Sequence, residues 1–107
     1  MNQEMQFQFD TMKKVLTMAE EYERCAQAIE VGIKKVILFP LVEREILKYR
    51  DNLRKNSQKA LFLLASMSQC VSKGILFSEF ETEIVDIEHS HQELLDEFES
   101  IIKDVLN

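Results

Sequence analysis

The sequence is poor in the residues that make turns. Its 107 residues include two glycines, one proline and no tryptophan. So few chain-reversing residues exclude a protein built of many short strands, because each strand needs a turn at both ends. Helix-forming residues dominate instead. We therefore expect an all-α protein made of a few long helices, folded as a single helical-bundle domain over residues 1–107.

Cysteines and long apolar runs are also scarce. Cys25 and Cys70 lack any metal-ligand spacing and lie in apolar stretches, which is typical of buried thiols in a reducing compartment. The longest apolar run, residues 36–42, contains Pro40, and it is far shorter than the roughly 20 residues that cross a bilayer. The N-terminal stretch also lacks the pattern of a secretory signal. These features favour a soluble, cytoplasmic protein without a membrane partner.

Apolar residues at intervals of three and four predict three helices. The first stripe runs from Met5 to Val36 and predicts a helix over about residues 3–38. We expect this helix to continue through Gly32 because the stripe keeps its register there, although Gly costs about 1 kcal/mol relative to Ala in a helix. Pro40 suits the first position of a second helix, predicted over about residues 40–72.

The remaining boundaries rest on capping chemistry. Lys73 and Gly74 match the end of the second helix, and Ser78 begins a capping box that predicts a third helix over about residues 78–106. The expected architecture is an elongated antiparallel bundle of three long helices that forms a dimer. Asn56 and Ser57 are good cap residues within the second helix, so a break near 56, giving a four-helix bundle, is the alternative.

Both histidines fall in the stretch IEHSHQE, residues 87–93, which raises the question of a metal site. His89 and His91 point to nearly opposite sides of a helix and cannot chelate one ion together. Glu88 and His91 do share a face, but two-metal carboxylate sites need such a pair from each of two helices, which only a dimer would supply. A polar residue that fixes register in an apolar seam is the better interpretation of His91. We expect no metal or other cofactor.

No enzyme signature is found in the sequence. It has no glycine-rich phosphate loop and no nucleophile turn, and two histidines supply little material for acid–base chemistry. We therefore expect a protein that is not an enzyme. The net charge of −6 also argues against nucleic acid as the partner.

The leading hypothesis is a protein-interaction module: a small helical adaptor, chaperone or assembly factor that binds another protein. It rests on surplus apolar residues over 36–42 and 60–71, because large exposed apolar patches usually mark interfaces. The residues predicted to bind the partner on this hypothesis are Phe39, Leu41, Phe62, Leu63 and Met67.

The alternative hypothesis is an acidic inhibitor or immunity-type protein. Residues 78–107 hold ten Asp and Glu against one Lys, whereas residues 41–77 hold seven Lys and Arg against three acidic residues. The third helix could therefore dock onto a basic target such as a toxin or a nucleic-acid-binding protein. Its predicted binding residues are Glu83, Asp86, Glu93 and Glu97. The competing interpretation is that these carboxylates only pair with the basic second helix of the same chain.

Overall fold

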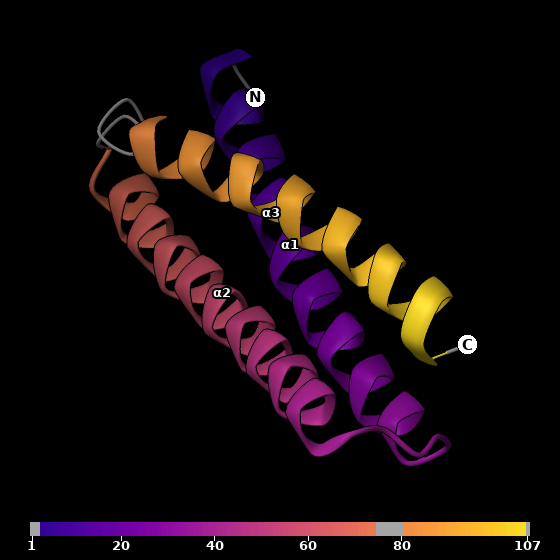
Figure 1. Ribbon diagram of the computed structural model, residues 1–107. Helices are drawn as coiled ribbons and strands as arrows, with labels where there is room; N and C mark the ends of the chain where they lie inside the picture. Colours follow the sequence, from indigo (N-terminus) through magenta and orange to yellow (C-terminus); the bar gives the residue numbers. More distant parts are fainter. Residues whose placement is uncertain (1–2, 75–80, 107) are drawn as a thin grey trace.

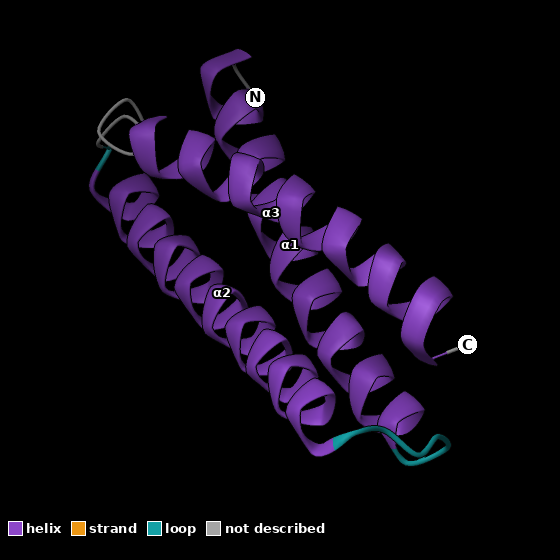
Figure 2. Cartoon of the chain, viewed as in Figure 1, coloured by secondary structure: helices purple, strands orange, loops and turns teal. Residues whose placement is uncertain are grey.

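The protein is an elongated all-α bundle, seen here in a computed structural model that describes residues 3–74 and 81–106. Three helices follow in order: α1 (Gln3–Ile33), α2 (Pro40–Lys73) and α3 (Glu81–Ile101), which ends in a short π-helical turn, η2 (Ile102–Leu106). Figures 1 and 2 show α1 and α2 side by side as an antiparallel hairpin, with α3 lying against it. The molecule measures 54 × 20 × 18 Å.

The core is almost entirely the seam between α1 and α2. Along α1 the buried side chains follow helical spacing, and opposite them lie those of α2. The larger buried residues of this seam are Val15, Met18, Tyr22, Ile29, Ile46, Tyr49, Leu53, Leu63 and Met67. Small residues, Ala19, Ala26 and Ala60, are buried between them, which lets the two helix backbones approach each other closely.

Helix α2 has the ends that its sequence predicts. Phe39 is extended, with φ −60° and ψ 142°, and its carbonyl accepts the first helical hydrogen bond from the Glu43 N–H at 3.0 Å. Pro40 occupies the first turn, where its missing N–H costs nothing. At the other end Gly74 takes the left-handed conformation, φ 73°, and its N–H bonds back to the Cys70 and Val71 carbonyls.

The alternative of a break near residue 56 is wrong, because α2 is one continuous helix, as the main prediction expects. Ser57 is buried, and its hydroxyl donates a hydrogen bond to the Ala19 carbonyl of α1 at 2.9 Å. Asn56 donates to the Asn52 carbonyl one turn earlier in its own helix. Both polar side chains are thus satisfied inside a helix, so neither is needed as a cap, and the four-helix alternative is excluded.

The predicted end of the first helix at 38 is also wrong, because α1 stops at Ile33. Beyond it a turn forms, in which the Lys35 N–H bonds to the Gly32 carbonyl at 3.1 Å. Residues 34–39 are needed to reverse the chain before Pro40. Gly32 weakens the helix at this point, and its missing Cβ leaves room for Leu106, whose Cδ1 would lie 3.0 Å from such an atom.

Helix α3 is attached more lightly than the other two. Its apolar stripe faces the hairpin, as the heptad spacing predicts, and comprises Ile84, Ile87, His91, Leu94, Phe98 and Ile101, continued by Val105. These side chains are half-buried, and no described side chain of α3 is fully buried. The predicted start at Ser78 lies outside the described residues. Among the described helices, none has both the length and the apolar character needed to span a membrane.

We predict that Leu53→Ala lowers the free energy of unfolding by about 2–5 kcal/mol, because Leu53 is fully buried in the α1–α2 seam. Leu61→Ala in the same helix is the matched control, since Leu61 is 48% exposed, and its loss should stay below about 1 kcal/mol. Urea unfolding followed by circular dichroism measures both. Equal losses would contradict the position of the core.

Candidate functional site

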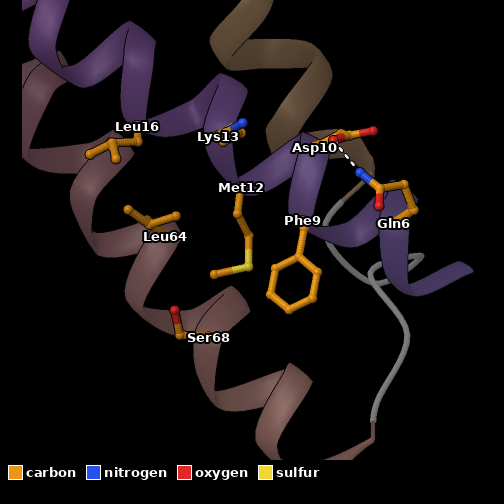
Figure 3. Close-up of a pocket in the computed structure, with 8 residues that line it drawn as sticks. All are labelled: Gln6, Phe9, Asp10, Met12, Lys13, Leu16, Leu64 and Ser68. Carbon is orange, nitrogen blue, oxygen red and sulfur yellow. Dashed lines mark hydrogen bonds between the residues drawn. The ribbon is translucent and has the colours of Figure 1, made fainter. Parts of the chain in front are cut away.

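An apolar groove is open to solvent between the first half of α1 and the last half of α2. Its apolar walls are Phe9, Met12 and Leu16 from α1 and Leu64 from α2, and these four residues define the groove. Figure 3 shows their side chains lying toward the space between the two helices. Leu16 is 39% exposed. Polar side chains form the rim: Gln6, Asp10, Lys13 and Ser68.

The groove faces away from α3. Lys14 of α1 pairs with Glu88 of α3 at 2.6 Å, so Lys14 marks the side of α1 that meets α3. Leu16 is two residues further on, about 200° around the helix. Phe9 and Leu16 are seven residues apart and share one side of α1. One face of the hairpin therefore carries α3, and the opposite face carries the groove.

Charged residues close the rest of this open face. Glu23 and Glu30 continue the line of Leu16 along α1 at intervals of seven. Arg54 of α2 bonds to Glu30 and reaches Glu23 at 3.3 Å, while Arg50 reaches Glu30 at 3.3 Å. The hydrogen bond from Arg54 holds the pKa of the Glu30 carboxyl below its usual value. The groove thus ends where this ionic network begins.

The residues predicted from the apolar surplus separate into two groups. Phe39 and Leu41 are exposed at the turn between α1 and α2, next to the exposed Ile37, and Phe62 on α2 is 76% exposed. Leu63 and Met67 lie instead in the seam with α1, where Met67 is fully buried. They hold the core together and are not part of an exposed surface, so that part of the prediction is corrected.

The acidic residues of α3 point to solvent. Glu83, Asp86, Glu93 and Glu97 are all exposed. Within residues 3–74 and 81–106, no Lys or Arg of α2 forms an ion pair with α3. The ion pairs that reach α3 within these ranges, Lys14 with Glu88 and Glu21 with His91, come from α1. The interpretation that basic α2 neutralises acidic α3 within one chain is therefore wrong for the described residues.

His91 occupies the seam between α3 and α1. Its ring meets the Tyr22 ring edge-on, with centroids 5.0 Å apart, and its Nε2 lies 2.9 Å from Oε2 of Glu21. Burial, with Glu21 nearby, raises the pKa of Tyr22 to about 12. The Tyr49 hydroxyl donates to the Leu94 carbonyl and ties α2 to the same part of α3. His91 thus lies as a polar residue in the otherwise apolar seam between α3 and α1.

The residues considered for a metal site are engaged elsewhere. Glu88 pairs with Lys14, and His91 contacts Glu21. In the part of the chain that the structure describes, no group of three His, Cys, Asp or Glu side chains is placed to hold a metal ion. Cys25 and Cys70 are free thiols and half-buried, and burial raises the pKa of Cys25.

Sequence reasoning missed the groove. Phe9, Met12 and Leu16 belong to the apolar stripe that predicts the first helix, and that stripe alone implies burial. In the structure Val15, Met18 and Ala19 take the core positions, so Phe9 and Leu16 stay partly exposed. The sequence feature that could have predicted the groove is the width of the apolar face of the first helix. Adjacent residues Val15 and Leu16 cannot both face one neighbouring helix.

Comparisons of the chain with protein-family models, with curated proteins and with solved structures find no match.

We predict that Glu30→Gln lowers the free energy of unfolding near pH 7 and has progressively less effect in acid. The folded-state pKa of Glu30 lies below its usual 4.5, so its contribution is present above that value and is lost as pH falls through the lowered pKa. Urea unfolding at a series of pH values measures the difference. Glu20→Gln is the control, because Glu20 is exposed and has no ion pair among the described residues. A difference independent of pH would contradict the ion pair.

Proposed function

We propose that this protein is a binding module without enzymatic activity, which acts by holding another protein in the groove between α1 and α2. The observation that supports this most is that Phe9, Leu16 and Leu64 form a continuous apolar wall open to solvent. An apolar groove framed by polar side chains has the layout of a protein interface, with an apolar centre and a polar rim. A small helical adaptor, chaperone or assembly factor would work in this way.

The partner element that best fits the groove is an amphipathic helix. Both walls are helices, so their side chains form ridges between which those of a third helix can insert. Such a helix would bury its apolar face on Phe9, Met12, Leu16 and Leu64, following the helix-in-groove mode of recognition. Its polar face would lie near Asp10 and Lys13 on the rim. The ionic network around Arg54 would limit how far along the hairpin it extends.

Self-association is a further part of the proposal. Leu41 and Phe62 are exposed on α2, away from the groove, and large exposed apolar side chains commonly become buried in an assembly. A homo-oligomer would cover them while leaving the groove free for a different protein.

We predict that Leu16→Glu removes groove-dependent partners, with a loss of retention of about tenfold or more, because a partner covering the groove would have to desolvate the new carboxylate. The fold should survive, since Leu16 is partly exposed. Immobilised protein is incubated with lysate of its own cells, and the retained proteins are quantified by mass spectrometry.

Val31→Glu is the matched control for this experiment. It introduces the same charge at an exposed position of the same helix, outside the groove. Partners that bind in the groove should be lost with Leu16→Glu and kept with Val31→Glu. If the Leu16→Glu variant retained the same proteins as the unaltered chain, the groove would not be the binding site.

A second candidate function is docking of α3 onto a basic protein, as an acidic inhibitor does. The observation that favours it is the exposure of Asp86, Glu93 and Glu97 with no Lys or Arg ion pair among the described residues. Charges that the fold does not neutralise remain available to steer and hold an oppositely charged partner.

We predict that the pair Asp86→Asn and Glu93→Gln changes the free energy of unfolding by less than about 0.5 kcal/mol, because within the described ranges these carboxylates form no ion pair with another helix. The same pair should weaken retention of basic proteins from a lysate. A clear loss of stability in urea unfolding, with retention unchanged, would mean that the carboxylates serve the fold instead.

A further inference from the structure

A line of basic residues follows the outer side of α2. Arg44, Lys48, Lys55 and Lys59 are all exposed, and their spacing of four, seven and four places them on one side of the helix. We refer to these four residues as the basic stripe. The exposed Leu41 and Phe62 extend it, each three residues beyond an end.

A matching line of acidic residues follows one side of α3 and η2, where Glu97 also lines a pocket shared with α2. Asp86, Glu93, Glu97 and Asp104 are exposed, and their spacing of seven, four and seven again keeps them on one side. We refer to these four residues as the acidic stripe. Val85, beside Asp86, is an exposed apolar residue on the same helix.

In the part of the chain that the structure describes, neither stripe is neutralised by another helix. Among the described residues, Lys48 lies 4.0 Å from Glu45 of its own helix, and Glu93 lies 3.1 Å from His89 of its own helix. All four of these side chains are largely exposed, so the contacts are worth little. Two complementary stripes thus stay open on one molecule.

We propose that a second copy of the chain covers these stripes, with α2 of each copy lying antiparallel to α3 of the other. The proposed dimer shares with the proposed function only the premise that the protein acts by association. It does not involve the groove, which lies on a different face. Charge complementarity indicates that the partner of the stripes is a second copy. That copy places its acidic stripe against the basic stripe and its basic stripe against the acidic stripe. The contact is therefore made twice, as a two-fold symmetric interface requires.

The spacings of the two stripes agree when the helices run antiparallel. Intervals of four and seven separate Arg44, Lys48 and Lys55. The same intervals separate Glu97, Glu93 and Asp86, counted in the opposite direction. Three pairs of opposite charges can therefore align in one register, over about 17 Å of helix.

The fold of the single chain sets the same register. Tyr49 of α2 bonds to Leu94 of α3, which places these two residues at one height along the bundle. A two-fold axis running along the bundle keeps heights unchanged between copies. Lys48 is one residue before Tyr49 and Glu93 one before Leu94, so in antiparallel helices they differ by two residues, about 3 Å. Long side chains span that difference, which brings Lys48 of one copy to Glu93 of the other.

The apolar residues add to this contact. Phe62 and Leu41 lie at the two ends of the basic stripe, and both are mostly exposed in the single chain. Partial burial of these side chains supplies the apolar contribution that solvent-exposed ion pairs alone lack. Because the remaining attraction is between exposed charges, the association should weaken as salt rises.

Two charge-reversed variants test the proposal. In one, Lys48→Glu and Lys55→Glu make the basic stripe acidic; in the other, Asp86→Lys and Glu93→Lys make the acidic stripe basic. Each variant alone should have its dimer dissociation constant raised about tenfold or more, because like charges then face each other at both contacts. Mixed together, the two should restore a heterodimer with an affinity within about threefold of the unaltered protein, since both contacts are again opposite in charge.

Sedimentation velocity of the full chain measures these states, over protein concentrations from about 10 μM to about 1 mM and at low and high salt. Circular dichroism verifies that each variant keeps its helices. The control is Lys34→Glu with Lys35→Glu, which makes the same change in net charge at exposed residues beyond the end of α1. This control should dimerise like the unaltered chain.

The sedimentation results test the dimer independently of binding in the groove. A monomer at every concentration, a dimer that the reversals leave intact, or two variants that fail to associate when mixed would each overturn it. Pairing of α2 with α3 inside one chain cannot produce the heterodimer, so that result is specific. Retention of partners by the groove is measured with Leu16→Glu, so either proposal can fail while the other stands.

Discussion

The close packing of α1 against α2 is the contact on which the rest of the structure depends. Buried alanines at 19, 26 and 60 bring the two helices together, and the Ser57 hydroxyl bonds directly to the Ala19 backbone. Larger side chains, among them Tyr22, Leu53 and Met67, fill the space between these points. Because burial of apolar surface is the main stabilising contribution in a domain of this size, the hairpin is the stable unit, and α3 is placed on it.

A two-helix hairpin has two broad faces, and this protein treats them differently. Helix α3 covers one face with half-buried apolar residues and is oriented by His91 and by the bond from Tyr49. The other face is closed by the Arg54 network along one half and left open as the groove along the other. The proposed binding of a partner helix follows from this asymmetry, because the open half lacks the cover that the opposite face receives from α3.

The sequence predicted correctly those helix ends that depend on the chemistry of single residues. Pro40 and Gly74 mark the ends of α2 because a missing N–H and a left-handed backbone are properties of those residues themselves. The end of α1 was predicted too late, since it is set by the length of chain needed to reverse direction. The heptad spacing of α3 correctly predicted which side faces the hairpin.

Tertiary packing determined what the sequence could not predict. Residues 60–71 are apolar around most of the helix, and only the position of α1 decides that Leu63 and Met67 are buried while Phe62 is exposed. The groove was missed for the same reason, because Leu16 and Val15 are equally apolar. The acidic surface was predicted from composition alone, because residues 78–107 hold ten carboxylates and a single Lys.

Native mass spectrometry of the untagged protein, drawn gently from its own cells, tests most directly whether the protein acts by association with protein. One mass reports copy number, a second chain and any bound small molecule together. If the protein acts in this way, we expect a species heavier than the 12.6 kDa chain, containing either two copies or another protein. The 12.6 kDa chain alone, or carrying only a small molecule, would contradict it.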